Sequence, residues 1–261
     1  MPGNVRCRPG TDPVESLSNW QLFFCASVVT VAFAVRGGTG FGGGAIAVPM
    51  LALVFPLQVT VPVVTVLNML SSIGHGIADW RHILWKAIWH VMPGSLIGVL
   101  VGLYMLGQFD PQPLGRALGA FVVLYALYVL FLARREVQVP KRWLPVVTVL
   151  TSTSAGFIGA LFGGAAGPIY VIYLNALRLG RDAFRVTITS IMLFQGLTRL
   201  AGYAVMGLYD RHVLLLLAAA LPMMLVGSWL GARLIRRFDP VWFGRAVGVV
   251  LLASGAALMI K

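Results

Sequence analysis

The chain has 261 residues, of which 59% are hydrophobic and 11% are charged, and its formal net charge is +12. Soluble domains carry about a quarter of charged residues, so this composition excludes an ordinary water-soluble globular protein. Apolar runs of about 17–25 residues, long enough to cross a hydrocarbon core of ~30 Å, recur along the chain. The sequence therefore predicts an all-α polytopic membrane protein embedded in a lipid bilayer.

The basic residues lie in short connectors between apolar segments and form no basic face, which indicates the positive-inside bias of membrane proteins and no nucleic-acid partner. Two cysteines, Cys7 and Cys25, make neither a disulfide framework nor a metal site. The sequence contains no catalytic motif and no metal-ligand spacing. It therefore predicts no enzyme activity, no cofactor and no metal.

In chain order, a disordered lead-in over 1–18 precedes two repeats of five apolar segments each. The first repeat, 19–135, contains segments at 20–36, 41–57, 61–78, 87–106 and 116–132. A basic cytoplasmic linker at 136–142 leads into the second repeat, 143–261, with segments at 143–162, 164–177, 186–206, 213–235 and 243–260. The second segment of each half is short and interrupted by glycine, so a re-entrant loop is an alternative to a crossing there.

The two halves resemble one another at a fixed offset. The pattern P-x-x-x-x-G-x-x-x-G occurs at 93–102 and again at 222–231, which is 129 residues later, and Phe-Asp-Pro follows it both times. A Gly-rich stretch that begins at Phe41 has a counterpart that begins at Phe162. Matches in several separated blocks indicate an internal duplication.

The basic residues also indicate how many segments cross. If all ten cross, five basic residues fall on one side and 14, Arg36 among them, on the cytoplasmic side, with Arg199 inside a segment. If the two short segments do not cross, the count becomes 10 against 9, so the bias favours ten crossings with both termini outside the cytoplasm. Five crossings per half is an odd number, which predicts two inverted repeats. Secondary transporters often have this architecture, with substrate bound near the midplane between the repeats.

The stretch G-x-G-F-G-G-G-A-I-A-V-P-M-L, from Gly38, resembles the first-half signature of the TauE/SafE family, also called toluene sulfonate uptake permeases. The Gly-rich echo at 159–168 and the paired proline–glycine segments fit the same family. The resemblance covers nearly the whole chain from about residue 28. It implies a multi-pass transporter in the bacterial inner membrane for sulfite, for sulfonates such as sulfoacetate, or for related small sulfur-containing anions.

Glycines in the short segments are the first candidates for a substrate site. A glycine run interrupts a helix and frees backbone N–H groups, which can point at an anion from the start of the next helix. Close packing of helices through small residues is the alternative explanation. The candidates are Gly42, Gly43, Gly44, Gly163 and Gly164.

The third segment carries a polar stripe of Asn68, Ser72, His75 and Asp79, which helical spacing places on one face. Exposure to lipid would be costly, so the stripe is expected to face the protein interior. Asn68 and Ser72 are candidate substrate ligands, and His75 with Asp79 is a candidate proton relay. A structural hydrogen-bonded seam between helices is the alternative.

The eighth segment adds Gln195, Thr198 and Arg199 as candidate substrate ligands. Arg199 is the one basic residue well inside a predicted segment. It is either a counter-charge for an anionic substrate or a side chain that extends to the outer interface.

Apart from Asp79, no carboxylate lies in a predicted segment, so the chain offers few groups for proton coupling. A negative cell interior drives an anion outward by ~2.3 kcal/mol per charge per 100 mV, and export is therefore favoured over uptake. A membrane-embedded enzyme and a non-transporting subunit of a membrane complex remain alternatives. A homodimer is compatible with the sequence, which does not decide the oligomeric state.

Overall fold

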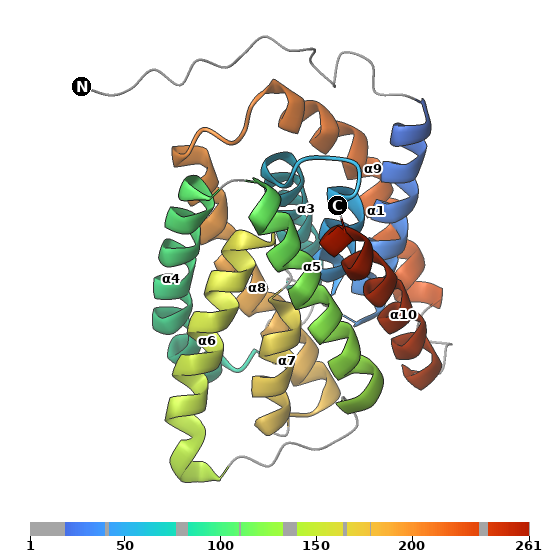
Figure 1. Ribbon diagram of the computed structural model, residues 1–261. Helices are drawn as coiled ribbons and strands as arrows, with labels where there is room; N and C mark the ends of the chain where they lie inside the picture. The colour runs from blue at the N-terminus through green and yellow to red at the C-terminus, as the bar shows by residue number, and fades with distance from the viewer. Residues whose placement is uncertain are drawn as a thin grey trace, which may run out of the picture.

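The computed structural model describes residues 19–39, 42–76, 83–109, 111–132, 140–163, 166–177, 179–234 and 240–260. The described chain folds into ten α-helices (Figure 1), with a π-helical turn at Tyr128–Leu132 and a 3₁₀ turn at Lys141–Trp143. The helices are α1 (Asn19–Thr39), α2 (Gly43–Ala52), α3 (Leu57–Gly76), α4 (Trp85–Gln108), α5 (Pro111–Leu127), α6 (Leu144–Leu161), α7 (Gly167–Ala176), α8 (Arg181–Val205), α9 (Arg211–Leu234) and α10 (Pro240–Ile260).

The all-helical prediction is confirmed, and the ten helices follow the ten predicted segments in order. The short second helices are also observed, since α2 and α7 have 10 residues each. Four helices are long and apolar enough to cross a bilayer, over Trp20–Gly38, Trp85–Gln108, Leu144–Leu161 and Arg211–Arg233. The lead-in at 1–18 and most of the linker at 136–142 lie outside the described residues.

Two pairs of the long helices pack closely through glycine: α4 lies along α6, and α9 lies along α1. A Cβ atom on Gly98 of α4 would collide with the carbonyl oxygen of Thr153 in α6. In the same way, a Cβ on Gly227 of α9 would collide with the carbonyl oxygen of Thr30 in α1. Small residues four apart allow such close approach in membranes, where lipid provides no hydrophobic drive. The repeated motif therefore builds one kind of crossing twice.

Two further pairs join helices at matching places in the repeats, α3 with α8 and α5 with α10. Met69 of α3 lies against Gly196 of α8. One turn earlier in α3, Thr65 lies near Tyr203, and Tyr203 comes two turns after Gly196 in α8. The α3 and α8 helices therefore run antiparallel. The α5 and α10 helices do likewise, because Gly119 meets Gly255 whereas Leu130 meets Gly248.

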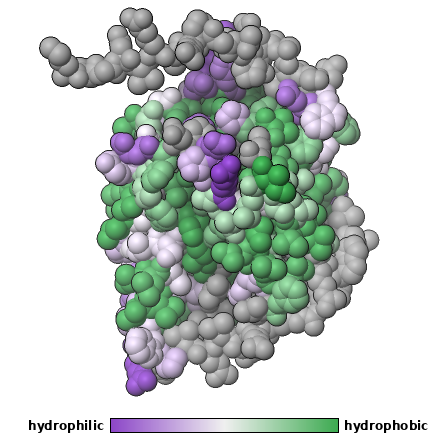
Figure 2. All heavy atoms as spheres, viewed as in Figure 1, coloured by the Kyte–Doolittle hydropathy of each residue, from purple (hydrophilic) through white to green (hydrophobic). Residues whose placement is uncertain are grey.

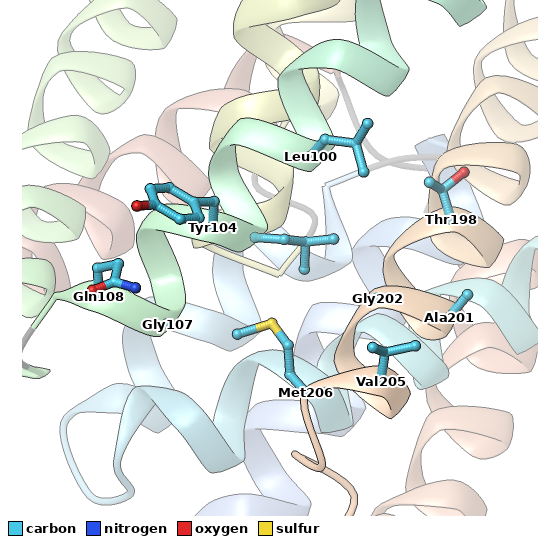
Figure 3. Close-up of a pocket in the computed structure, with 10 residues that line it drawn as sticks. Leu100, Tyr104, Gly107, Gln108, Thr198, Ala201, Gly202, Val205 and Met206 are labelled. Carbon is cyan, nitrogen blue, oxygen red and sulfur yellow. The ribbon is translucent and has the colours of Figure 1, made fainter. Parts of the chain in front are cut away.

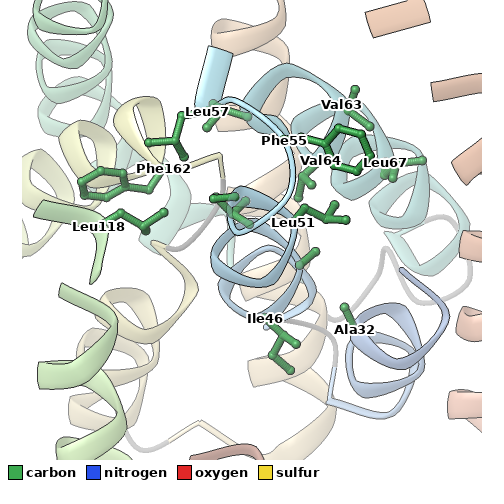
Figure 4. Packing of buried hydrophobic residues seen from close by; sticks show 14 of the residues in the cluster. Ala32, Ile46, Leu51, Phe55, Leu57, Val63, Val64, Leu67, Leu118 and Phe162 are labelled. Atoms are coloured by element: carbon green, nitrogen blue, oxygen red, sulfur yellow. The ribbon is translucent and has the colours of Figure 1, made fainter. Parts of the chain in front are cut away.

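Buried apolar side chains form two separate clusters. The larger one joins α1, α2, α3, α5, α9 and α10 to the C-terminal parts of α4, α6 and α8. Figure 4 shows part of it, with Leu51 of α2 between Leu67 of α3 and Leu118 of α5. The smaller cluster joins the first turns of α4 to α6, α7 and the first half of α8.

The outer surface of the described chain suits lipid contact. Large apolar side chains such as Trp89, Leu150 and Val205 are exposed, the last at 90%. Figure 2 shows apolar residues over most of one face, with hydrophilic residues gathered mainly toward its two ends. An exposed apolar belt with polar ends is the arrangement that a bilayer requires.

Candidate functional site: two glycine breaks and two buried arginines

Each short helix follows a break made by a glycine with positive φ. Gly42, at φ 90°, precedes α2, and Gly163, at φ 60°, follows α6 before α7. L-residues with a side chain rarely adopt this conformation. Gly163 is also packed closely, because an added Cβ would lie 3.1 Å from the carbonyl oxygen of Val61 in α3. Glycine is therefore required at both breaks for backbone geometry.

Arg36 lies beside the first break, and its side chain is 1% exposed. The Nη2 group donates to the backbone oxygen of Asn68 at 3.1 Å and to Oγ of Ser72 at 2.5 Å. The Nη1 group approaches Sδ of Met192 in α8 at 3.7 Å. The side-chain stem packs on Gly43, whose added Cβ would lie 3.1 Å from Cδ of Arg36.

Arg199 of α8 lies beside the second break. Its side chain is also 1% exposed. Its Nη1 group donates to the backbone oxygen of Gly159, near the end of α6, at 2.7 Å, while its Nε finds no hydrogen-bond partner in the described part of the chain. An added Cβ on Gly159 would lie 2.7 Å from Nη1, so glycine provides the space for the guanidinium. Because its side chain is buried, Arg199 does not extend to the outer interface, which was the alternative to a counter-charge for an anion.

Both arginines lie inside the protein, and Asn68 lies between the two breaks that they accompany. Among the Asp and Glu residues, Asp210 is the one whose side chain the structure describes, and it accepts from the backbone N–H of Val213. The described residues therefore place no carboxylate beside either guanidinium. Buried charges are costly unless they are paired, and the acceptors that the described residues offer to the two guanidinium groups are neutral.

Asn68 and Ser72 are buried, so they lie in the protein interior as the polar stripe predicts. The backbone oxygen of Asn68 and the hydroxyl of Ser72 accept from Arg36. The Nδ2 group of Asn68 donates to the backbone oxygen of Gly163 at 3.4 Å, so Asn68 connects the arginine at the first break to the second break. Its Oδ1 atom is buried without a partner.

Gln195 lies one turn before Arg199 in α8 and belongs to a buried polar cluster. Its Nε2 group donates to Oγ of Ser95 in α4 at 2.7 Å and to Oη of Tyr170 in α7 at 2.6 Å. Its Oε1 atom has no partner among the described residues. Tyr170 of this cluster is also the member that interacts electrostatically with Arg199. The atom left free in this cluster is therefore a hydrogen-bond acceptor, whereas the free atom of Arg199 is a donor.

The other predicted site residues are distributed as follows. Gly43 and Gly44 are buried in the first turn of α2. Thr198, which precedes Arg199 in the chain, is half-buried, and its hydroxyl donates to the backbone oxygen of Phe194. Gly164 and Asp79 lie outside the described residues, as does the side chain of His75, whose backbone ends α3.

Sequence reasoning missed Arg36, Ser95 and Tyr170. Arg36 was expected in a cytoplasmic connector because the apolar run stops there; this is wrong, since α1 continues to Thr39 and buries the side chain. An available signal was its place directly before Gly37 and Gly38, inside the region of the first break. Ser95 and Tyr170 carried no signal, because isolated hydroxyls in apolar helices are common.

Two cavities lie away from the arginines. The larger, about 600 Å³, lies between α4 and α8 and is lined mostly by apolar side chains (Figure 3), with Thr198 at its edge. The smaller, about 230 Å³, is lined by residues such as Phe55, Leu57 and Gln112. The described residues contain no group of three His, Cys, Asp or Glu that could hold a metal ion.

Comparison with known proteins identifies the family. The family described as sulfite exporter TauE/SafE matches residues 25–258. This chain belongs to the TauE/SafE family. It is 31% identical over 198 residues to a probable inner membrane transporter protein TsaS of Comamonas testosteroni, which covers 75% of this chain and 80% of that protein.

A second relative is the probable sulfite/organosulfonate exporter TauE of Cupriavidus necator, 27% identical over 229 residues, or 85% of this chain and 87% of that protein. No solved structure matches. The family and both relatives' names, together with the long apolar helices, identify a multi-pass transporter of the inner membrane and not an enzyme.

Proposed function

We propose that this TauE/SafE protein is a secondary transporter that exports small sulfur-containing oxyanions, such as sulfite or sulfoacetate. The observation that carries the proposal is the pair of buried arginines, Arg36 and Arg199, with no carboxylate beside them among the described residues. The printed names of the two relatives support the substrate class.

The proposed anion site lies between the glycine breaks. Arg36 and Arg199 supply charge, and the unused donor there is Nε of Arg199. The amide of Asn68 has a second N–H beyond the one that it donates to Gly163. Gln195 donates both of its N–H groups to Ser95 and Tyr170, so its proposed role is to position these side chains beside the anion. The starts of α2 and α7 add backbone N–H groups, since the first N–H groups of a helix have no partner within it. A compact oxyanion with several acceptor oxygens suits guanidinium groups, which bind oxyanions through two parallel hydrogen bonds.

The proposed architecture is two inverted repeats near 19–135 and 143–261, with all ten helices in the membrane domain and the linker at 136–142 in the cytoplasm. Three contacts support it. Matching helices run antiparallel in the pairs α3–α8 and α5–α10. The crossing of α4 with α6 has the crossing of α9 with α1 as its counterpart, with glycine against a backbone carbonyl in both. An inverted pair related by a two-fold axis in the membrane plane has this pattern.

The outward direction is supported by charge. A site that carries fixed positive charge and few ionisable relay groups suits an anion that follows the membrane potential, worth ~2.3 kcal/mol per charge per 100 mV. His75 and Asp79 remain the candidates for a proton relay if transport proves to be coupled to protons.

Flux from proteoliposomes tests the proposal. Vesicles loaded with sulfite or sulfoacetate, and containing the purified protein alone, are expected to release the anion faster when the interior is made negative. A pH gradient at fixed voltage is expected to have little effect. A strict need for the pH gradient would show proton coupling, whereas flux of an unrelated solute without flux of any sulfur oxyanion would refute the substrate assignment.

A further inference from the structure

The helices pack as two bundles that differ from the two sequence halves. The first bundle consists of α1, α2, α3 and α9, because α9 packs against both α1 and α3. The second bundle consists of α4, α6, α7 and α8, because α4 packs against both α6 and α8. The pair α5–α10 packs on α2 and so accompanies the first bundle. Each bundle thus holds three consecutive helices of one half and one helix from the other half.

The exchanged helices are held tightly. Gly98 and Gly102 of α4 leave no room for a Cβ against the backbone of α6, and Gly227 and Gly231 of α9 leave none against the backbone of α1. Separation of either pair would lose backbone-to-backbone contact along two helical turns. These crossings are therefore the rigid parts of the molecule.

The second bundle has a hydrophobic core of its own at one end. That core contains Ile88 near the start of α4, Tyr173 near the end of α7 and Ile188 in the first half of α8. At the opposite end, the same bundle merges into the larger core through Leu103 of α4 and Tyr203 of α8. The two bundles are thus separately packed at one end and joined at the other.

The polar contact between the two glycine breaks is longer than the hydrogen bonds that the arginines make inside the bundles. Within the bundles, Arg36 reaches Ser72 at 2.5 Å, and Arg199 reaches the Gly159 oxygen at 2.7 Å. Between the bundles, Asn68 Nδ2 lies 3.4 Å from the Gly163 oxygen, and Arg36 Nη1 lies 3.7 Å from Sδ of Met192. An N–H···O bond normally measures 2.7–3.2 Å, so the contact of Asn68 with Gly163 across the seam is weak. The helices α3 and α8 also pack closely along the seam, and Thr65 interacts with Tyr203 across it at the joined end.

We propose that these two bundles, and not the two sequence halves, are the bodies that move against each other during transport. Arg36 belongs to one bundle and Arg199 to the other, so the seam between α3 and α8 closes around the anion from both sides. The inference rests on the proposed function, because it assigns the motion to the site where the anion binds.

Two engineered disulfides distinguish the bundles from the halves, in a protein whose Cys7 and Cys25 have been replaced by Ser and Ala. Met69→Cys with Gly196→Cys links the bundles across the seam, since a Cβ on Gly196 would lie 3.4 Å from Cβ of Met69, close to disulfide spacing. Leu103→Cys with Gly202→Cys links α4 to α8 inside the second bundle. There a Cβ on Gly202 would lie 3.2 Å from Cγ of Leu103, the position that a cysteine sulfur takes.

Both disulfides join the first sequence half to the second. Each is therefore expected to block a motion of the sequence halves, whereas the seam disulfide alone blocks a motion of the bundles. The seam disulfide is expected to lower sulfite flux by about tenfold or more, and reduction is expected to restore it. The disulfide inside the bundle is expected to leave flux within about twofold. Loss of flux with both would indicate motion of the sequence halves, and loss with neither would show that the seam need not open. Either result overturns the proposal.

A readout without sulfite separates this inference from the substrate assignment. Spin labels at Trp89 of α4 and Val149 of α6, both exposed, report on the second bundle, whereas Trp89 with Val226 of α9 spans both bundles. In nanodiscs the first pair is expected to give one narrow distance and the second a broad or double distribution. A broad distribution for the first pair with a narrow one for the second would refute the proposal that the bundles move as bodies. Absent sulfite flux in the reduced proteins, with the expected distances, would refute only the substrate assignment.

Discussion

Arg199→Met separates the functional from the structural role of a buried arginine. Methionine keeps an unbranched stem of similar length and removes the charge. Arg199 is 1% exposed, and among the described residues its Nη1 group donates to the Gly159 oxygen. Its Nε donor is unused. If the charge exists to receive an anion, its removal should lower binding much more than stability.

The magnitudes follow from these contacts. A unit charge about 4 Å from an anion, at an effective dielectric constant of about 20, contributes about 4 kcal/mol, which is nearly a thousandfold in Kd. Loss of the hydrogen bond from the charged group costs about 1.5–3 kcal/mol. An arginine at the centre of a membrane helix itself costs about 2.5–3.5 kcal/mol. The last two values nearly cancel, so the free energy of unfolding is expected to change by less than about 2 kcal/mol.

Calorimetric titration with sulfite and thermal unfolding in detergent measure both quantities. The matched control is Arg116→Met, which removes a charge from the exposed face of α5 and should alter neither. Arg199→Lys keeps the charge without the planar group and is expected to bind with intermediate affinity. A Kd within about threefold of the parent protein in Arg199→Met would refute the role in anion binding. A stability loss of about 3–5 kcal/mol, the cost of breaking a buried ion pair, would instead show a structural partner for this arginine.

Three further substitutions test other parts of the site and the topology. Gly159→Ala places a methyl group 2.7 Å from Nη1 of Arg199; sulfite affinity should fall about tenfold or more, while Gly115→Ala, which has open space around its Cβ, should leave it unchanged. Asn68→Leu removes the amide between the breaks and is expected to weaken sulfite binding by about 1–3 kcal/mol with normal expression; unaltered affinity would reduce Asn68 to a packing residue. Gln108→Cys, at the end of α4, should react with an impermeant thiol reagent added outside intact cells in a background without other cysteines, and failure to label would contradict the proposed orientation.

Much of the fold could be predicted because it depends on local sequence. Apolar length sets where helices lie, and glycine and proline set where they are interrupted, so the ten helices, with the two short ones among them, were expected within about five residues of their observed bounds. Within the site, Asn68 and Ser72 were placed correctly inside the protein, because helical periodicity aligns them on one face of α3. Thr198 shares α8 with Arg199 but does not join it, since its hydroxyl returns to the helix backbone at Phe194.

Arg36 shows the limit of that reasoning. An arginine at the end of an apolar run is ordinarily an interfacial residue, and no local rule distinguishes one that turns inward. The burial of Arg36 depends on Gly43, which follows the break, and on the backbone carbonyl of Asn68 in α3. Asn68 lies 32 residues after Arg36 in the chain. Contacts of that kind exist only after three helices have assembled.

The sequence by itself determined that the chain spans a membrane, that it is a TauE/SafE protein, and that glycine-rich stretches follow Phe41 and Phe162. Composition, periodicity and internal repetition are properties of the chain alone, and lipid forces such segments into helices because no water can satisfy their backbone groups. The tertiary structure alone decided which helices exchange between the halves and which side chains meet. Close helix packing between membrane segments depends on the fit of one backbone against another, and that fit brought Arg36 and Arg199 to one interior.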